Sequence, residues 1–221
     1  DREVGFEGTT AIVGNSIPVG VGLGLALQAK KKKNVSVVFL GDGAIEEGAF
    51  YESANFAAVR NLPVLFVCEN NLYSVYSPLN VRQPKNRKIY KMVQGMGIKS
   101  IIVDGNNVED VYKAVLKAKA EILKNKQPIF IEMSTYRWRE HCGPNFDNNI
   151  GYRDEKEFLR WKKKDPIKIF SDRLLKNHKI SEVQLKKIYT SIEKEIDEAF
   201  DFAKKSSFPK LALSTSTIFA K

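Results

Sequence analysis

Apolar runs alternate with longer helical segments along the chain up to residue 134. Four short runs are almost continuously apolar, as is typical of strands buried on both faces of a sheet, namely residues 35–40, 63–68, 100–103 and 128–133. Three longer segments have the length of helices that cross over a sheet, namely residues 17–32, 44–60 and 108–123. The alternation predicts an α/β fold with a doubly wound, mostly parallel sheet. In such sheets, ligands bind beyond the carboxyl ends of the strands.

The pattern changes after residue 134. Residues 135–152 contain Gly, Pro and Asn without periodicity, which predicts a long loop, and loops of that length are usually functional or mobile. The following residues are helical in pattern up to residue 207, and Ser181 is a good N-cap for the last helix. We therefore expect an α/β domain over residues 1–150, which includes the loop, and a helical extension over residues 151–221.

Composition agrees with a globular chain. The 221 residues are 43% hydrophobic and 10% aromatic, which is enough to bury a core. The longest apolar candidate for a membrane span, residues 17–29, is broken by glycines and shorter than the roughly 18 residues required, so we expect no membrane partner. The chain begins with Asp1 and shows no signal-peptide pattern, which suggests a missing N-terminal piece. With only two cysteines and no disulfide or zinc spacing, a reducing cytoplasm fits best.

The net charge of +10 raises nucleic acid as a partner, but the distribution of the lysines weakens that idea. Residues 30–33 are four lysines that close a predicted helix, where cations complement the helix dipole. The other lysines scatter among glutamates in the last third, without aromatic residues between them. A solvated basic surface is therefore the better interpretation, and we expect no nucleic-acid partner.

Asp42 stands between two glycines where an apolar run ends and a helical pattern begins. Glycines let the backbone approach a ligand closely, and the N–H groups of Gly43 and Ala44 at a helix start form an anion site. A carboxylate beside a phosphate needs a cation between them, and Mg²⁺ typically takes one or two carboxylates plus phosphate oxygens. An Asp that caps an ordinary helix remains the alternative.

Asn70 and Asn71 follow the next apolar run, with 26 residues between Gly43 and Asn70. One helix and one strand fill that gap and return the chain to the same sheet edge. The Asn71 amide oxygen and the Tyr73 carbonyl then become available to the same hard cation. A simple Asn-Asn turn remains the alternative.

This pairing of GDG with NN resembles the thiamine diphosphate motif, and the resemblance covers nearly the whole chain. The ordered segments that carry it are AIVGNSIPVGVGLGLA, GDGAIEEGAFYESANFAAVRNLPVLFVCENNLYS, TYRWREHCGP and GYRDEKEF followed by KKKDPI. Together they are similar to the alpha subunit of the thiamine-dependent 2-oxo acid dehydrogenase first component, a family that includes pyruvate, branched-chain and acetoin dehydrogenases.

The resemblance implies that Asp42, Asn71 and the Tyr73 carbonyl ligate Mg²⁺. It also implies that the backbone amides at Gly43 and Ala44 hold the diphosphate.

The same resemblance assigns roles to two further segments. The backbone of Ala11 and Val13 would contact the aminopyrimidine, and the Val13 side chain would prop the cofactor in a bent conformation. A Gly-capped turn before the helix at residues 17–32 is the alternative. His141 would reach the diphosphate and the reacting intermediate, where imidazole suits proton transfer or charge stabilisation. An exposed loop histidine is the alternative. The other histidine, His178, lies among lysines and is interpreted as a surface residue.

The implied activity is oxidative decarboxylation of a 2-oxo acid, with transfer of the acyl group to a lipoyl group on an acyltransferase component. The family's general-base glutamate comes from a separate beta subunit, so the resemblance also implies an active site in an alpha–beta heterotetramer. Three alternatives stay open. They are a non-oxidative carboligase or ketol transferase in sugar or surface-glycan synthesis, a non-catalytic assembly subunit and a nucleotide-binding module.

The chain departs from the family pattern in four places. Cys142 stands where mitochondrial members carry a phosphorylated serine, so that switch is not expected. The loop between His141 and Tyr152 is slightly longer than the mitochondrial pattern, which leaves the substrate open. Glu46 and Glu47 follow GDGAI and are typical of a first helical turn, although they could also line an entrance or meet a partner. The family's N-terminal stretch, with a Tyr-Arg pair for the diphosphate, is not in this sequence.

Overall fold

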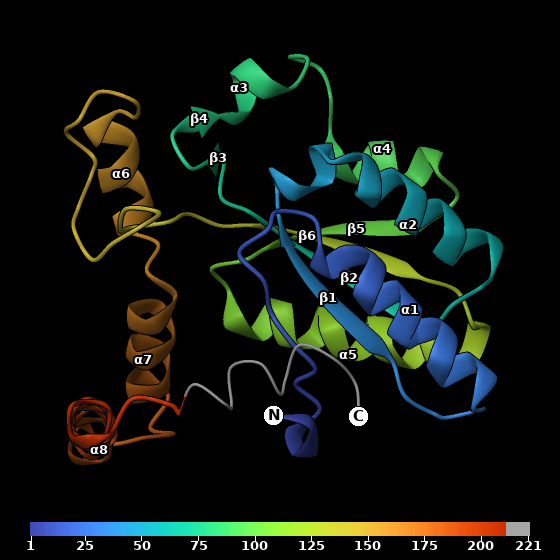
Figure 1. The fold of residues 1–221 in the computed structure, drawn as a ribbon. Coiled ribbons are helices and arrows are strands. Elements are labelled where there is room, and N and C mark those ends of the chain that lie inside the picture. The colour runs from blue at the N-terminus through green and yellow to red at the C-terminus, as the bar shows by residue number, and fades with distance from the viewer. Residues whose placement is uncertain (211–221) are drawn as a thin grey trace. The chain divides into compact units, whose positions relative to one another are not determined.

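The computed structural model describes residues 1–210, which contain the predicted parallel sheet (Figure 1). Its strands are β1 (Ser36–Gly41), β2 (Val64–Asn70), β5 (Lys99–Asp104) and β6 (Ile129–Ser134). They lie in the order β1-β2-β6-β5, and each neighbouring pair is parallel. The predicted α/β class with a doubly wound sheet is confirmed.

Helices cover both faces of the sheet (Figure 1). One face packs against α1 (Ser16–Ala29), α2 (Gly48–Val59) and α4 (Ile89–Gly95), and the other against α5 (Val108–Asn125). Alternate residues of β2 point to opposite faces, as the period of a strand requires. Phe66 therefore joins the first core, edge-to-face with Phe50 at 6.2 Å between ring centroids, while Leu65 packs on the α5 side.

Two glycines bring α1 close to the sheet. A Cβ atom at Gly20 would lie 2.3 Å from Cγ2 of Val38, and one at Gly24 would lie 2.5 Å from Cγ2 of Val64. Neither distance is compatible with a larger side chain, so these two glycines of the predicted helix serve close packing rather than a turn.

The expectation that all four strands are buried on both faces is wrong for the edges of the sheet. Only β2 and β6 are buried almost throughout. In β1, burial alternates, and Val37 and Phe39 are 45% and 63% exposed. In β5, Ile102 is 53% exposed. Both are edge strands, and apolar composition alone does not distinguish an edge strand from a central one.

The helix expected at residues 44–60 is interrupted. A short 3₁₀ helix, η2 (Ala44–Glu46), follows Asp42, and α2 starts afresh after Glu47, whose φ of −72° and ψ of 139° are extended. The N–H groups of Gly43 and Ala44 therefore lie at the start of a 3₁₀ turn and not at an α-helix N-terminus. This corrects the predicted start of the α-helix, while the anion site at these two residues stays a prediction.

The chain leaves the sheet after β2 in an excursion that the sequence pattern did not predict. It consists of a small antiparallel hairpin, β3 (Tyr73–Ser74) with β4 (Ser77–Pro78), and the single turn α3 (Leu79–Arg82) (Figure 1). Leu72 and Val75 have positive φ values of 73° and 53°, which make the tight bends of this excursion. It carries residues of the candidate site described below.

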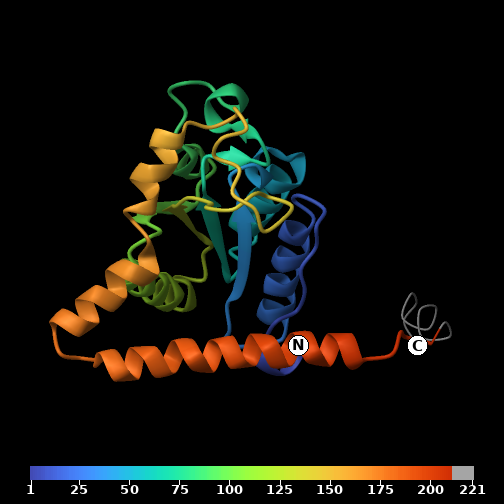
Figure 2. The ribbon, with the colours of Figure 1, turned by 90° about the vertical axis from the view of Figure 1, so that its left-hand side faces the viewer.

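The C-terminal helices are present as predicted. They are α6 (Glu155–Lys162), α7 (Pro166–Lys176) and α8 (Glu182–Lys205). A short 3₁₀ helix, η1 (Arg2–Val4), lies near the N-terminus. Ser181 caps α8 in a reciprocal capping box with Gln184, which satisfies two backbone donors. Figure 2 shows α8 as one continuous helix.

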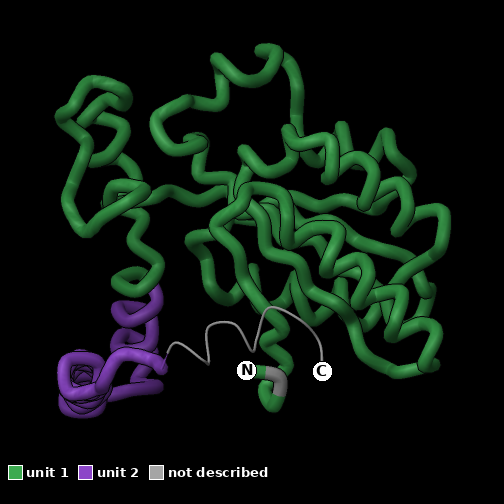
Figure 3. Tube along the Cα trace, in the orientation of Figure 1, with its two compact units in different colours: residues 1–169 green, residues 170–221 purple. Residues whose placement is uncertain are grey.

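Two compact units are distinguished, residues 1–169 and residues 170–221 (Figure 3). The sheet, the loop at residues 135–152 and α6 belong to the first unit. The second unit contains the end of α7 and all of α8. Within residues 1–210, no helix has the length and apolar character needed to cross a membrane.

Candidate functional site

The carboxyl ends of β1 and β2 bring the two halves of the predicted motif together. The strands pair in parallel with Gly41 opposite Glu69, so that Asp42 and Asn71 leave the sheet at the same edge. The backbone N–H of Asn71 donates a hydrogen bond to Oδ1 of Asp42 at 3.3 Å. The structure thus places the carboxylate of GDG and the amide of NN side by side.

Asp42 is buried, with 1% of its surface exposed, and its carboxylate is paired. Arg82, at the end of α3, donates from Nη2 to Oδ2 of Asp42 in a close ion pair. The same guanidinium donates from Nη1 to Oε1 of Glu46 at 2.6 Å, and Gln83 Nε2 donates to that oxygen at 3.0 Å. A buried carboxylate requires such partners, because an unpaired charge is expensive away from water.

Asn71 holds the bend that follows β2. Its side-chain oxygen accepts a hydrogen bond from the backbone N–H of Tyr73 at 2.9 Å, which is an Asx turn. The amide oxygen keeps a second lone pair. The turn interpretation of Asn-Asn is therefore correct for the local structure, and the turn sets Asn71 and Tyr73 beside Asp42.

Gly43 is required by close packing. A Cβ atom at this position would lie 2.5 Å from Oγ of Ser74 and 3.8 Å from Nη1 of Arg82. Its φ of −72° is ordinary for any residue, so the missing side chain matters and not the backbone conformation. No atom lies within 4 Å of a Cβ atom placed on Gly41, the other glycine of the motif.

The oxygen atoms at this edge fit a hard divalent cation. One carboxylate, one amide oxygen and one backbone carbonyl, from Asp42, Asn71 and Tyr73, are the ligand types that Mg²⁺ prefers. No group of three His, Cys, Asp or Glu residues suited to a metal occurs among the described residues, so a metal here would need further oxygens from a bound ligand.

The segment with Ala11 and Val13 forms a turn just before α1. Both residues are exposed, Val13 to 58%, and no hydrogen bond joins either of them to Asp42 in the described part of the chain. Gly14 ends the turn with a φ of 80°, and a Cβ atom there would lie 3.0 Å from Cγ of Glu47. The turn therefore packs beside the start of α2, and η2 lies between that start and Asp42 in the chain.

His141 is exposed in the loop after β6. Its neighbour Glu140 closes a turn with Asn145, through a backbone hydrogen bond of 2.9 Å and a side-chain one of 2.8 Å to Oε1. Within residues 1–210, no hydrogen bond or ion pair joins His141 to Asp42 or Asn71. The structure brings the metal-ligand candidates together but leaves His141 outside that group.

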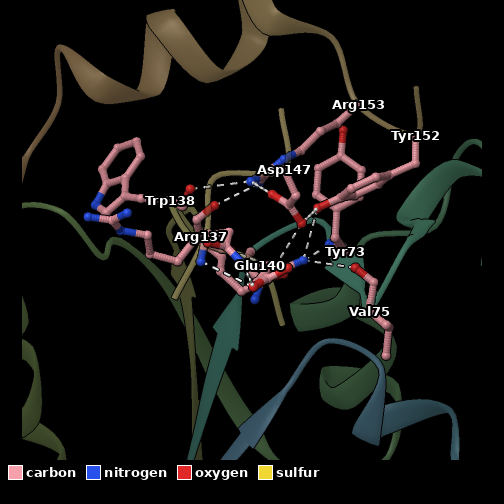
Figure 4. A network of polar contacts seen from close by, with 11 residues as sticks. Tyr73, Val75, Arg137, Trp138, Glu140, Asp147, Tyr152 and Arg153 are labelled. Atoms are coloured by element: carbon pink, nitrogen blue, oxygen red, sulfur yellow. Dashed lines mark hydrogen bonds and ion pairs between the residues drawn. The ribbon is translucent and has the colours of Figure 1, made fainter. Parts of the chain in front are cut away.

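A buried cluster of charges that was not predicted as a unit holds the loop (Figure 4). Asp147 is 2% exposed and accepts hydrogen bonds from Nη2 of Arg153 and, at 2.6 Å, from the hydroxyl of Tyr152. Arg137 lies 3.6 Å from the same carboxylate and donates to the carbonyl of Val75 at 2.8 Å. The loop is thus tied to itself and to the β3–β4 hairpin.

The charges of this cluster decide the protonation of Asp147. Burial acts to raise its pKa, but the hydrogen bond from Tyr152 and the guanidinium groups of Arg153 and Arg137 outweigh burial and lower the pKa below the ordinary value. The carboxylate is therefore ionised at neutral pH and is paired with these guanidinium groups.

Aromatic rings surround the cluster and reach from the hairpin to α6. Tyr136 stacks on Trp161 at 5.5 Å between ring centroids, and burial raises the pKa of Tyr136 to about 12. Tyr73 packs edge-on against Tyr152 at 5.5 Å, and its hydroxyl donates to Oε2 of Glu157 at 2.5 Å. Burial, followed by this hydrogen bond, raises the pKa of the Tyr73 hydroxyl.

Tyr73 therefore connects the two halves of the region. Its backbone belongs to the turn beside Asp42, and its side chain is bonded to α6.

The sequence offered one signal for the loop cluster, the polar residues Arg137 and Arg153 within an aromatic stretch, but it offered none for their partner Asp147. Both cysteines are free thiols, and burial raises the pKa of the Cys68 thiol.

Comparisons with known proteins agree on one family. The model of the family described as "Dehydrogenase E1 component" matches residues 1–212. The pyruvate dehydrogenase E1 component subunit alpha of Rickettsia bellii is 35% identical over 204 residues, which are 92% of this chain and 61% of that protein. The mitochondrial subunit of Sminthopsis macroura is 35% identical over 93% of this chain and 56% of its own length. That of Solanum tuberosum is 34% identical over 100% of this chain and 55% of its own length. The chain thus spans little more than half to three fifths of the length of these curated relatives.

Proposed function

The chain belongs to the dehydrogenase E1 component family, and from this premise we propose that it is the thiamine diphosphate-binding part of a 2-oxo acid dehydrogenase alpha subunit. The observation that carries the proposal is the meeting of Asp42 and Asn71 at the carboxyl edge of the sheet. Relatives named pyruvate dehydrogenase make pyruvate the first 2-oxo acid to test.

We assign the metal to the oxygens that the structure gathers beside Asp42. The carboxylate of Asp42, the free lone pair of the Asn71 amide oxygen and the Tyr73 carbonyl would hold Mg²⁺, with diphosphate oxygens as the remaining ligands. The backbone at Gly43 and Ala44 would face the diphosphate, and the missing Cβ of Gly43 leaves room for Ser74 beside that backbone. Ala11 and Val13 would contact the aminopyrimidine from the turn beside α2.

Thiamine diphosphate, when bound, supplies the electron sink for the loss of carbon dioxide from the 2-oxo acid. The chain's own residues would fix the charge and position of the diphosphate and exclude water on the side of the aromatic cluster. His141 would hold or move a proton near the reacting carbonyl, a role to which an imidazole side chain is suited. Since His141 is exposed in the structure, this role requires the loop to approach the cofactor.

The partners follow from the same proposal. A beta subunit would complete the active site in an alpha–beta heterotetramer, and a lipoyl acyltransferase would accept the acyl group. Because the chain spans only part of its relatives, these roles are assigned to the full-length protein.

Calorimetry on the full-length protein with its beta subunit tests the metal site. We expect thiamine diphosphate to bind in the presence of Mg²⁺, and Asp42→Ala and Asn71→Ala to weaken that binding at least tenfold, since each removes a ligand of the cation. Asp104→Ala is the matched control, because Asp104 ends β5 at the same sheet edge and its carboxylate accepts a hydrogen bond only from the backbone N–H of Asn106 among the described contacts. Equal affinities in all four proteins would contradict the metal assignment.

An assay of several 2-oxo acids with an artificial electron acceptor tests the reaction. We expect decarboxylation coupled to reduction of the acceptor, with pyruvate examined first. Carbon–carbon bond formation without reduction of the acceptor would instead identify a non-oxidative carboligase. A protein that binds the cofactor and turns over no substrate would identify an assembly subunit.

A further inference from the structure

Arg82 occupies the position where Asp42 needs a cation. Its Nη2 pairs with Oδ2 of the carboxylate, its Nη1 lies 2.6 Å from Oε1 of Glu46, and its Nε donates to the carbonyl of Ser77 at 3.1 Å. The Arg82 side chain is only 11% exposed. All three nitrogen atoms of the guanidinium therefore make polar contacts. Arginine side chains are seldom this buried without a partner.

The guanidinium also lies over the backbone that we assign to the diphosphate. A Cβ atom on Gly43 would be 3.8 Å from Nη1 of Arg82, so the two groups face each other closely. A metal that bridges Asp42 to a diphosphate would bind the same carboxylate that Arg82 now neutralises. The cation and the guanidinium would then lie close together, and two positive charges at that separation repel each other, which favours departure of Arg82.

The surroundings of Arg82 are arranged for release. Glu46 would still hold Nη1 of the guanidinium after Nη2 has left Asp42, so that the charge of Arg82 is never left without a partner. Gln83, which also binds Glu46, is 8% exposed, and its Oε1 is buried with no hydrogen-bond donor among the described residues. The cluster thus has an acceptor to spare while Arg82 is bound to Asp42.

We propose that Arg82 is a built-in counter-ion that neutralises Asp42 before the cofactor arrives and is displaced from it by the metal–diphosphate pair. The inference rests on the proposed function of Asp42. Arg82 stabilises the empty site, because the buried carboxylate would otherwise be unpaired. It also competes with the metal, because the site can bind the cation only in the fraction of molecules in which Arg82 has moved.

Two measurable consequences follow for Arg82→Gln in the full-length protein. Its affinity for Mn²⁺ in the presence of thiamine diphosphate should rise about tenfold, since the binding-competent fraction rises. Its melting temperature without metal and cofactor should fall below that of the wild type, and the difference should disappear at saturation with both. The two effects have opposite signs, and a residue that only supports the fold would lower stability in both states.

Electron paramagnetic resonance of free Mn²⁺ measures the affinity without any turnover, and thermal unfolding with and without both ligands measures the second effect. Arg87→Gln is the matched control, because it removes the same charge from the same segment and its side chain is exposed. We expect this control to bind Mn²⁺ like the wild type and to melt like it in both states.

The outcomes separate the two proposals. Tighter Mn²⁺ binding by Arg82→Gln but not by Arg87→Gln supports the counter-ion role. Unchanged or weaker binding by Arg82→Gln, with a wild type that does bind Mn²⁺ and thiamine diphosphate, overturns the counter-ion role and leaves the proposed function standing. A wild-type protein that binds no Mn²⁺ under these conditions overturns the proposed function and this inference with it.

Discussion

Two carboxylates in the first unit, Asp42 and Asp147, are both buried and both paired with arginine, yet their surroundings differ. Asp147 accepts from Arg153, whose side chain is 0% exposed, and from Tyr152, with Arg137 close by. Asp42 accepts from one guanidinium, Arg82, which is shared with Glu46, and from one backbone amide.

The difference shows how to distinguish a structural carboxylate from one that is free to change partner. Asp147 has two guanidinium groups and a phenol, and the partners that surround it have no second carboxylate to turn to among the described contacts. Arg82 does have a second carboxylate, so it can leave Asp42 at a lower cost. Burial alone does not separate the two cases, because both residues are within 2% of full burial.

The largest expected effect is the loss of the Asp147 charge. We expect Asp147→Asn to lower the free energy of unfolding by about 3–5 kcal/mol, because two buried or half-buried guanidinium groups lose their counter-ion. Urea unfolding followed by tryptophan fluorescence is the appropriate measurement, since both tryptophans, Trp138 and Trp161, lie in the aromatic cluster beside Tyr136.

Glu121→Gln is the control for that measurement. Its carboxylate pairs with Lys99 at 2.5 Å, but the Lys99 side chain is 53% exposed, and such pairs contribute at most about 1 kcal/mol. A loss for Asp147→Asn no larger than that for the control would show that the loop does not depend on the charge cluster.

The second-largest effect is expected from acid, which should weaken the Asp147 cluster. The folded pKa of this carboxyl is lowered below its unfolded value, so its contribution to stability is present above the ordinary pKa of about 4 and is lost as the pH falls through the lower folded pKa. We expect the urea concentration at the unfolding midpoint of the wild type to decrease when the pH drops below about 4. The midpoint of Asp147→Asn should fall less over the same range, and parallel curves for the two proteins would contradict this assignment.

A smaller effect is expected where the two regions join, at Tyr73. Tyr73→Phe removes the hydrogen bond to Glu157 and should lower the free energy of unfolding by about 2 kcal/mol, as is typical of a hydrogen bond to a charged group. The backbone carbonyl is unchanged, so metal-dependent affinity for thiamine diphosphate should stay within about twofold of the wild type, well under 1 kcal/mol.

Tyr76→Phe is the matched control for the joining residue. Tyr76 lies in the same hairpin, packs against Tyr152 at 5.0 Å and is 49% exposed. Its hydroxyl has no protein partner in the part of the chain that the structure describes, so we expect less than about 0.5 kcal/mol of change. If Tyr73→Phe behaved like this control, α6 would not be anchored through Glu157.

The sequence predicted the central fold well, because a parallel sheet follows from simple periodicity. The apolar runs at residues 63–68 and 128–133 correspond to the buried strands β2 and β6. The same topology made it predictable that Asp42 and Asn71 would meet, since parallel strands end at a common edge. The burial of the edge strands was predicted wrongly, because an exposed Phe39 cannot be distinguished from a buried phenylalanine by residue type alone.

Most of the site's charge pairing could not be predicted in the same way. Arg82 is 40 residues from Asp42 and follows a hairpin that has no periodic signal. Arg153 belongs to the segment GYRDEKEF that carries the family resemblance. Its partner Asp147 lies in a polar loop without periodicity, where the sequence does not distinguish one polar residue from another. Long-range pairs of this kind depend on where loops return, and neither periodicity nor composition determines that.

The smallest expected change in stability, and the sharpest contrast, is at Asp42. Asp42→Asn should lower the free energy of unfolding by only about 1 kcal/mol, because Arg82 keeps Glu46 and the Ser77 carbonyl as acceptors and an amide oxygen can still accept from Asn71. The same variant should weaken metal-dependent binding of thiamine diphosphate about a hundredfold, since it removes the one charged ligand of the proposed cation. Urea unfolding and calorimetry on the same preparations measure both quantities. A loss of stability as large as that of Asp147→Asn would remove the distinction between the two carboxylates, because it would show that the Asp42–Arg82 pair is a fixed part of the fold and not an exchangeable one.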